Sequence, residues 1–270
     1  MMQAMTKTLY LFVPAVRLDR VSKAIATGVD KVIIDLEDTV ADNAKDSVRQ
    51  ALLDFDKQMT HRYWLRINAY DTAAYQADIA CVNELVQLDG LLLPKCQSAE
   101  QATQVHQQSQ KPIIAMIETA TGLANLVQIA QATGVQALSF GCLDLAQSLG
   151  VRPDSAAYAT LLDKVRTDLL VYSAAYGLQP PIETIFVNFA NEQAFADRVA
   201  YWRDFGFAGQ LLIHPRQVAI ARRVLADEQD WAFAEAIYQR HEQTGEIAFA
   251  IDGKMVDLPL IQWARRLLDK

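Results

Sequence analysis

Cysteine and histidine are scarce in this chain of 270 residues, and neither occurs at a spacing typical of a metal site. The three cysteines, Cys81, Cys96 and Cys142, lie far apart and include no C-x-x-C pair, and there are four histidines. Scattered cysteines in odd number are typical of a reduced protein, and without a His/Cys cluster a zinc or iron site is not expected. We therefore expect the protein to be located in the cytoplasm, or in an organelle matrix if the source is a eukaryote.

Long hydrophobic runs and an excess of positive charge are also missing. No stretch approaches the roughly 18 apolar residues of a membrane span. The N-terminus lacks a basic segment followed by a sustained apolar stretch, so we expect no signal peptide and no membrane association. The net charge of −7 argues against a nucleic-acid partner but not against small anionic ligands. With no linker or low-complexity segment, we expect a single domain over residues 1–270, with residues 1–8 disordered.

Short, nearly continuous apolar runs recur along the chain, as in strands of a parallel sheet that are buried on both faces. The runs are Leu9–Ala15, Lys31–Asp38, Tyr63–Asn68, Gly90–Cys96, Pro112–Thr119, Ala137–Asp144, Pro180–Phe186 and Gln210–Pro215. Segments with helical spacing separate them, such as Arg20–Thr27, Thr121–Thr133 and Ala156–Tyr176. Eight strand–helix alternations in this length predict an α/β fold, the (β/α)8 TIM barrel, rather than the competing doubly wound open sheet.

The chain continues well beyond its eighth apolar run. Helical patterns over Gln217–Leu225 and Gln229–Gly245 precede a hairpin-like segment, IAFAIDGKMVD, and a last amphipathic helix. This exceeds what one closing helix requires. We therefore expect a C-terminal helical and hairpin extension over residues 228–270, which covers the barrel mouth as a lid or is swapped into a neighbouring subunit.

Polar side chains gather at the ends of the apolar runs, which is where barrel enzymes carry their catalytic groups. These residues are Asp35, Glu37, Asp38, Arg66, Asn68, Lys95, Glu118, Asp144 and His214. Since the carboxyl ends of the strands surround one mouth, we expect these side chains to converge there. His214 is the one residue of this set for which we expect a structural rather than a catalytic role, as a hydrogen-bonded histidine before a proline.

The pair Glu118 and Asp144 lies on adjacent predicted strands, and two carboxylates with waters form the usual Mg²⁺ site. Glu37 and Asp38 would accept hydrogen bonds from metal-bound waters. Arg66 would supply positive charge where negative charge develops on a substrate. The alternative is a set of mouth carboxylates that only form salt bridges with basic neighbours.

Two glycines and one further aspartate complete the expected mouth. Gly122 opens the helix after the fifth run, and Gly141 precedes the end of the sixth; both would let the backbone approach a ligand closely. Asp35 lies deeper in its strand, and we expect it either to share in the site or simply to support Lys95.

An ordered set of motifs then points to a family. The motifs are LFVPA, IIDLEDTV, LRIN, LLLPK, IETATG, FGCLDLAQSLG, IHPRQV and GKMVDLP. Together, from about residue 9 to 269, they resemble the citrate lyase β-chain-like (CitE-like) branch of the HpcH/HpaI aldolase superfamily. The resemblance implies a trimeric or hexameric TIM barrel that cleaves or forms 3-hydroxyacyl-CoA thioesters, for example citryl-, citramalyl-, malyl- or β-methylmalyl-CoA.

The resemblance also implies roles for residues. Glu118 and Asp144 match the metal ligands, and Glu37 and Asp38 match the acidic pair near the metal-bound waters. Arg66 matches the arginine that contacts the thioester oxygen, and Arg17 and Lys23 match basic positions that bind CoA phosphates. Asp257 matches a tail aspartate that acts as acid or base in a neighbouring subunit. As alternatives, Arg17 and Lys23 could be ordinary surface charges, and Asp257 could cap the final helix. The chain departs from the family at Glu183, where an aspartate is frequent, and at Gly209–Gln210, where the family has Gly-Lys.

We therefore predict a homotrimeric lyase that requires Mg²⁺, with Mn²⁺ as an alternative ion. It would cleave the C–C bond of a citramalyl-CoA or malyl-CoA type substrate to acetyl-CoA and a 2-oxo acid. Three alternatives remain: malyl-CoA thioesterase or malate-synthase-like activity, aldol chemistry on free pyruvate, and the β-subunit of a citrate lyase complex that acts on an acyl-carrier-protein thioester.

Overall fold

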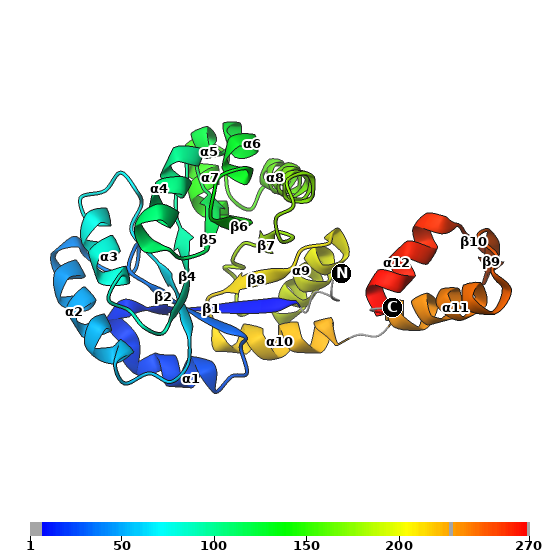
Figure 1. Cartoon of the computed structure of the whole chain (residues 1–270), viewed down its shortest axis with the longest axis horizontal. Helices are drawn as coiled ribbons and strands as arrows, with labels where there is room; N and C mark the ends of the chain where they lie inside the picture. Colours follow the sequence, from blue (N-terminus) through cyan, green and yellow to red (C-terminus); the bar gives the residue numbers. More distant parts are fainter. Residues whose placement is uncertain (1–6, 227–228, 269–270) are drawn as a thin grey trace. The chain divides into compact units, whose positions relative to one another are not determined.

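The computed structural model describes residues 7–226 and 229–268. Eight parallel strands close into a barrel in chain order, so that the first strand pairs with the second and the eighth (Figure 1). The strands are β1 (Thr8–Pro14), β2 (Lys31–Asp35), β3 (Tyr63–Arg66), β4 (Leu88–Leu93), β5 (Ile113–Ile117), β6 (Val135–Phe140), β7 (Ile182–Glu183) and β8 (Gly209–Leu212). The predicted TIM barrel is confirmed.

The strands are apolar on both faces because one face fills the barrel and the other packs against helices. Strand β5, with the sequence IIAMI, is buried at all five positions. The barrel interior is filled by residues from every strand, and Phe12 and Ile185 pack partly exposed against this core. The core residues are Tyr10, Ile33, Trp64, Leu92, Ile114, Met116, Ala137, Ile182 and Leu211.

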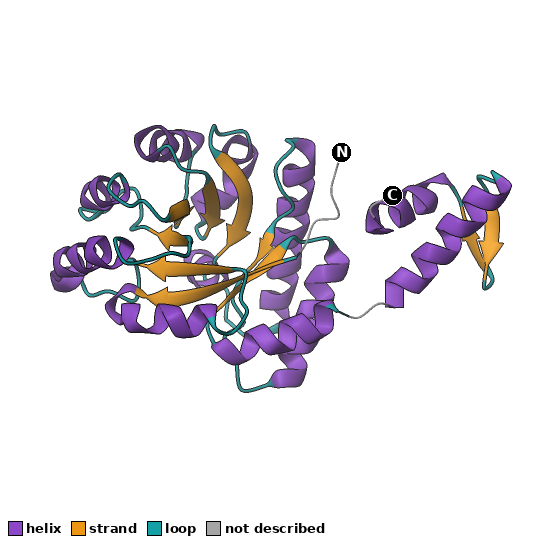
Figure 2. Cartoon of the chain, turned by 60° about the horizontal axis from the view of Figure 1, so that its bottom comes forward, coloured by secondary structure: helices purple, strands orange, loops and turns teal. Residues whose placement is uncertain are grey.

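Helices form the layer outside the strands, as Figure 2 shows. They are η1 (Ala15–Arg20), α1 (Val21–Ile25), η2 (Asp42–Ala44), α2 (Lys45–Asp56), α3 (Tyr75–Val82), α4 (Ala99–Ser109), α5 (Ala120–Ala124), α6 (Leu126–Ala130), α7 (Cys142–Leu149), α8 (Ala156–Ala175), α9 (Glu192–Phe205) and α10 (Pro215–Leu225). The single helix expected over Thr121–Thr133 is wrong: Asn125 leaves helical geometry and separates α5 from α6. Its side-chain amide donates to the Gln97 carbonyl at 2.8 Å, which ties this break between the helices to the loop after β4.

The end of the chain forms a compact unit of its own. Residues 8–221 form one compact unit, and a second compact unit includes residues 222–226 and 229–268. The extension expected over residues 228–270 falls in the second unit as far as it is described, and its exact start stays a prediction. The second unit contains α11 (Gln229–Thr244), β9 (Phe249–Ile251), β10 (Lys254–Val256) and α12 (Leu258–Leu268) around an apolar core. Its core residues are Ala234, Ile237, Val256, Ile261, Ala264 and Leu268.

The hairpin and last helix expected in this unit are confirmed. Strands β9 and β10 pair antiparallel across Asp252 and Gly253, both in the left-handed region at φ 50° and 76°. That is the conformation of a two-residue hairpin turn, for which Asp-Gly is a favoured sequence. The action of this unit as a lid or swapped element stays a prediction.

Three other expectations concern the ends, the cysteines and the membrane. Strand β1 already begins at Thr8, so the disorder expected through residue 8 is wrong at Lys7 and Thr8, and residues 1–6 lie outside the described part.

Cys81, Cys96 and Cys142 are buried and unpaired, as expected of a reduced protein. Within the described residues, no helix combines the length and apolar character needed to cross a bilayer.

Candidate active site

The expected polar residues lie at the carboxyl ends of neighbouring strands or just beyond them. Arg66 is the last residue of β3, Lys95 lies two residues beyond β4, and Glu118 directly follows β5. Asp144 was expected at the end of the sixth strand, and that placement is wrong, since β6 ends at Phe140 and Asp144 is in the first turn of α7. A helix N-terminus favours a negative charge, and this helix begins two residues after the carboxyl end of β6.

Arg66 is held by a buried partner, Asp35. The Nε and Nη2 atoms of Arg66 donate to the two Asp35 carboxylate oxygens at 2.7 and 2.8 Å. Asp35 also accepts the Glu37 amide at 3.0 Å and the Thr39 hydroxyl at 2.8 Å. The expected support of Lys95 by Asp35 is therefore wrong, because the planar guanidinium engages both carboxylate oxygens.

The ionisation of this pair follows from its contacts. Burial alone would raise the pKa of Asp35, but the hydrogen bonds and positive charge of Arg66 outweigh it and hold the pKa below 3.8. Burial would likewise lower the pKa of Arg66, whereas Asp35, Glu37 and Asp38 raise it. Both groups are therefore charged, and the guanidinium, stacked 5.1 Å above the Phe12 ring centre, is a fixed positive charge at the mouth.

The acidic pair Glu37 and Asp38 lies between two basic side chains. Lys95 Nζ pairs with Glu37 and lies 3.6 Å from Asp38, while Arg66 Nη1 lies 3.2 Å from Asp38. Glu37 Oε2 is 2.9 Å from Arg66 Nη1, an ion-pair distance, but it accepts no aligned hydrogen bond in the described structure. Burial raises the pKa of Glu37 despite both neighbouring cations. This buried oxygen of Glu37 is ion-paired with Arg66 and can still accept an aligned hydrogen bond, such as one from a metal-bound water.

Glu118 is almost completely buried, with 2% of its surface exposed. Its Oε2 accepts the Lys95 main-chain N–H at 2.8 Å. Its Oε1 lies against the backbone of Gly141, where a Cβ atom would come within 2.0 Å of it. Burial, with the nearby charge of Glu37, raises the pKa of Glu118 to about 8, and Asp144 contributes in the same direction.

These features fit a divalent cation bound by Glu118 and Asp144. A buried carboxylate close to other carboxylates is unfavourable as an anion unless a cation neutralises it. Among the residues described, no three or more His, Cys, Asp or Glu side chains converge as a metal-binding group. Mg²⁺ needs no such group, since it commonly takes one or two carboxylates and completes its octahedron with water and substrate oxygens.

The two glycines approach protein groups rather than open space for a ligand. Gly141 makes room for the Glu118 carboxylate, as described above. Gly122 lies against the Cys96 carbonyl, 2.4 Å from where its Cβ would be. Thr119 caps α5 by accepting the Gly122 N–H at 3.0 Å, so this helix start is already occupied by protein atoms.

A buried lysine that the sequence pattern did not single out, Lys45, holds the backbone of the loop that carries the acidic pair. Lys45 Nζ donates to the carbonyls of Leu36 and Glu37 at 3.2 and 3.3 Å, and it also bonds Asn68. Asn68 in turn donates its backbone and side-chain N–H groups to Asp78 at 2.7 Å. Lys45 lies five residues beyond the motif IIDLEDTV, at the start of α2, where no local signal separates a buried lysine from a surface one.

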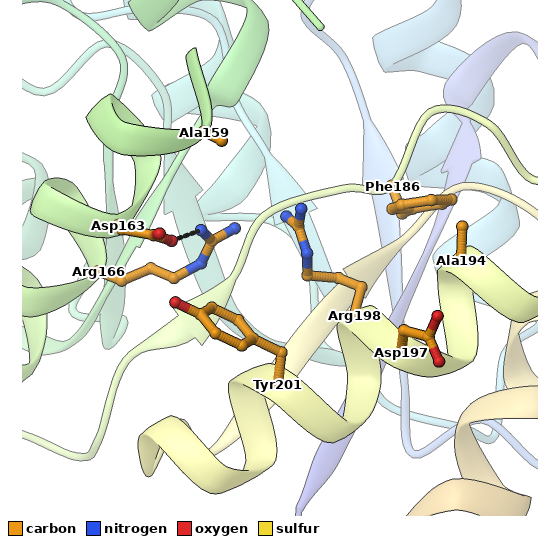
Figure 3. Close-up of a pocket in the computed structure, with 8 residues that line it drawn as sticks. All are labelled: Ala159, Asp163, Arg166, Phe186, Ala194, Asp197, Arg198 and Tyr201. Carbon is orange, nitrogen blue, oxygen red and sulfur yellow. Dashed lines mark hydrogen bonds and ion pairs between the residues drawn. The ribbon is translucent and has the colours of Figure 1, made fainter. Parts of the chain in front are cut away.

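The side chains of Glu183 and Gln210, where the chain departs from the family, contact helix residues rather than the polar residues of the mouth. Glu183 points outward and forms a buried ion pair with Arg166, at 2.6 and 2.9 Å, and lies 3.5 Å from Arg198. Both arginines border a cavity of about 440 Å³ between α8 and α9, where Figure 3 shows their guanidinium groups close together. Gln210 is buried and accepts the Trp202 indole N–H at 2.9 Å. These side chains therefore connect the barrel wall to its helices.

The residues expected to bind CoA lie on the first helical turns after β1. Arg17 is 44% exposed and pairs with Asp19 at 2.9 Å. Lys23 is exposed on α1 and forms no hydrogen bond or ion pair with the described residues. His214 stacks on Phe189 at 4.5 Å and accepts the Arg216 N–H, which agrees with a structural histidine.

Asp257 lies in the second unit, between β10 and α12. Its carbonyl accepts the Ile261 N–H at 3.0 Å, so the residue begins the helix. The residue is half-buried, and its carboxylate forms no hydrogen bond or ion pair with the described residues. The alternative that the Asp257 side chain caps α12 is therefore wrong.

Comparison with known proteins gives this geometry a family. Residues 8–215 match the model of the HpcH/HpaI aldolase/citrate lyase family. A citrate lyase subunit beta-like protein of Mycobacterium tuberculosis is 31% identical over 96% of this chain and 93% of its own. Rat mitochondrial citramalyl-CoA lyase is 28% identical over 96% and 84%, and a (3S)-malyl-CoA thioesterase of Cereibacter sphaeroides is 32% identical over 96% and 93%.

Solved structures agree with the sequence relatives. The crystal structure of M. tuberculosis CitE in complex with magnesium, acetoacetate and coenzyme A superimposes with a TM-score of 0.87 at 28% identity, covering 98% of each chain. The match therefore includes the barrel and most of the extension. The chain belongs to the HpcH/HpaI aldolase/citrate lyase family, and with it to the carbon–carbon lyases that the ordered motifs predicted.

Proposed function

We propose that the chain is a Mg²⁺-dependent lyase that cleaves the C–C bond of a short 3-hydroxyacyl-CoA to acetyl-CoA and a 2-oxo acid. The observation that carries the proposal is the buried Glu118 carboxylate, whose pKa is raised by burial and by the charges of Glu37 and Asp144. It shares the barrel mouth with the Arg66 guanidinium that Asp35 holds in place. A CitE relative binds magnesium, acetoacetate and coenzyme A, which supports the same ligand classes here. Substrates of the citramalyl-CoA and malyl-CoA type rank first.

Glu118 and Asp144 would hold the metal ion, with Glu37 and Asp38 accepting hydrogen bonds from its water ligands. When bound, Mg²⁺, or Mn²⁺ in its place, supplies Lewis acidity toward the carboxylate and hydroxyl oxygens of the acid portion. Asp35 keeps Arg66 in place by two hydrogen bonds, so the guanidinium needs no rearrangement to act.

Arg66 would stabilise the negative charge on the thioester oxygen as the C–C bond breaks. Cleavage would begin when the substrate hydroxyl loses its proton to water. The enolate carbon of acetyl-CoA would then gain a proton from the carboxyl group of Asp257, in its protonated form, reaching from a neighbouring subunit. Condensation would run the same steps in reverse, with Asp257 as the base. Arg17 and Lys23 would bind the CoA phosphates, and the homotrimer, or a hexamer, would be the functional unit.

A thioesterase is the second candidate, because one relative of 32% identity is named a (3S)-malyl-CoA thioesterase. The same mouth would then polarise the thioester carbonyl toward water instead of breaking a C–C bond. Two further forms of the reaction are malate-synthase-like condensation and action on an acyl-carrier-protein thioester as the β-subunit of a citrate lyase complex.

One experiment separates these activities. Citramalyl-, malyl-, β-methylmalyl- and citryl-CoA are incubated with the purified chain and Mg²⁺, and acyl-CoA, 2-oxo acid and free CoA thiol are measured. The lyase predicts equal amounts of acyl-CoA and 2-oxo acid from one ester, the acyl-CoA being acetyl-CoA for three of the esters and propionyl-CoA for β-methylmalyl-CoA. Free CoA and hydroxy acid without 2-oxo acid would establish the thioesterase, and no turnover of any free ester would favour the subunit of a complex.

A further inference from the structure

Lys95 has an unusual backbone for a residue with a side chain. Its φ is 48°, in the left-handed region, where contact between Cβ and the carbonyl oxygen is unfavourable. Gln110 and Asp252, which share this conformation, lie at a helix C-cap and a hairpin turn, where it is common. Lys95 follows Pro94 in a turn just beyond β4, at the barrel mouth, where glycine or asparagine is the usual residue at a left-handed position. Such conformations persist where surrounding contacts enforce them.

The left-handed backbone directs the Lys95 amide at Glu118. The N–H donates to Oε2 at 2.8 Å, so this oxygen is held by the main chain. The other oxygen, Oε1, lies against Gly141 in the volume that a Cβ atom would fill. The carboxylate is thus fixed on two sides, by one amide and one glycine, before any cation binds.

The side chain of Lys95 stabilises the same conformation. Its ammonium pairs with Glu37 and lies 3.6 Å from Asp38, both on the loop after β2. Glu37 is 7% exposed and the Lys95 side chain 31%, so the pair is shielded from water on the Glu37 side. Shielding strengthens an ion pair, which offsets the cost of the backbone conformation.

We propose that Lys95 is a positioning residue for the metal ligand Glu118: its ammonium holds the left-handed backbone, and that backbone orients the carboxylate through the amide. This rests on the proposed function, in which Glu118 binds Mg²⁺. It follows that Mg²⁺ affinity depends on the backbone conformation at residue 95, and not only on the charge there.

Two variants separate conformation from charge. Lys95→Gly and Lys95→Ala both remove the ammonium, but glycine adopts the left-handed region without penalty and alanine does not. We expect Mg²⁺ to bind Lys95→Gly about tenfold more tightly than Lys95→Ala, measured by isothermal titration calorimetry on the full chain. Equal dissociation constants in the two variants would overturn the proposal.

Gln110 offers a matched control, since it has a φ of 54°, is exposed and ends α4, at the opposite end of the barrel. Gln110→Gly and Gln110→Ala should bind Mg²⁺ equally well. A difference as large as that at Lys95 would mean a general backbone effect and would overturn the proposal. A wild-type chain that binds no Mg²⁺ would overturn the proposed function as well, whereas normal wild-type binding with equal Lys95 variants overturns only the role of Lys95.

Should Lys95→Ala fail to fold, amide hydrogen exchange decides the question in a chain that keeps Lys95. The Lys95 amide should exchange slowly in the wild type and at least about tenfold faster in Glu118→Ala, since its acceptor is then gone. Equal exchange rates would show that the carboxylate does not hold this amide and would overturn the proposal.

Discussion

Arg66 and Asp35 show what one residue pair contributes at the mouth. Asp35 is 1% exposed and provides both oxygens to a guanidinium that is 11% exposed. Removing one partner of a buried pair leaves the other charge without compensation. Arg66 would keep its ion pairs with Glu37 and Asp38, which limits the loss.

Asp35→Asn should therefore lower the free energy of unfolding by about 3 kcal/mol, measured by urea denaturation. Asp38→Asn is the control, because Asp38 meets the same arginine but is 51% exposed, and its loss should stay below about 1 kcal/mol. A similar fall in the free energy of unfolding in both variants would show that the buried pair stabilises the fold no more than the exposed one.

The same aspartate predicts a pH dependence. The pKa of Asp35 lies below 3.8 in the folded chain, so between that pKa and 3.8 the folded state binds fewer protons than the unfolded state. Its contribution to stability is complete above this window and is lost as the pH falls through the folded pKa. The stability difference between wild type and Asp35→Asn should be constant from about pH 5 to 7 and shrink below about pH 4. A difference that persists or grows in acid would contradict the pairing.

Individual partners were the least predictable part of the site. The sequence placed Glu118, Arg66 and the acidic pair at one mouth because strand ends follow from hydrophobic patterning. It could not tell that Asp35 binds Arg66 rather than Lys95, since both bases lie at neighbouring strand ends and the choice depends on side-chain geometry. Nor could it find the left-handed conformation of Lys95, because lysine carries no local signal for it.

Among the helices and strands, β7 and its neighbours depend on one buried ion pair. Glu183 is fully buried and Arg166 has 2% of its side chain exposed, and they join β7 to α8. Glu183→Gln should lower the free energy of unfolding by about 3–5 kcal/mol, because Arg166 would keep only the half-exposed Asp163. Mg²⁺ affinity should not change, since this pair faces away from the mouth.

Asp168→Asn on the same helix is the matched control. It removes an ion pair in which the Asp168 side chain is 24% exposed and the Lys164 side chain 68%. The free energy of unfolding, measured by thermal or urea unfolding, should fall by about 0.5 kcal/mol or less. An equally small loss in Glu183→Gln would mean that the buried pair does not stabilise the junction of β7 and α8.

All eight strands were predicted from the sequence, because strands buried on both faces are continuous apolar runs bounded by polar residues. The ends were less certain. The sixth run was extended through Asp144, although the chain turns at Gly141 and enters α7. Apolar residues continue through this turn, so hydrophobicity alone cannot mark where the strand stops and the helix starts.

For the whole molecule, the prediction most open to test is that the second unit completes a neighbour's site. Glu118→Gln and Asp257→Asn chains should each be inactive. Mixed and reassembled, they should regain activity in about one quarter of the sites, where an intact Glu118 meets an intact Asp257 from another copy. Mixtures that stay inactive would show that the tail does not act between subunits.

The requirement for a metal ion at Glu118 and Asp144 is the central claim, and one assay tests it directly. The release of 2-oxo acid from the preferred CoA ester is followed in EDTA and after Mg²⁺ is restored, for the wild type, Glu118→Gln and Asp144→Asn. We predict that EDTA abolishes the wild-type rate, that Mg²⁺ restores it, and that both variants remain at least about a hundredfold slower with Mg²⁺ present. A wild-type rate that is unchanged in EDTA, or variants as fast as the wild type, would contradict the account.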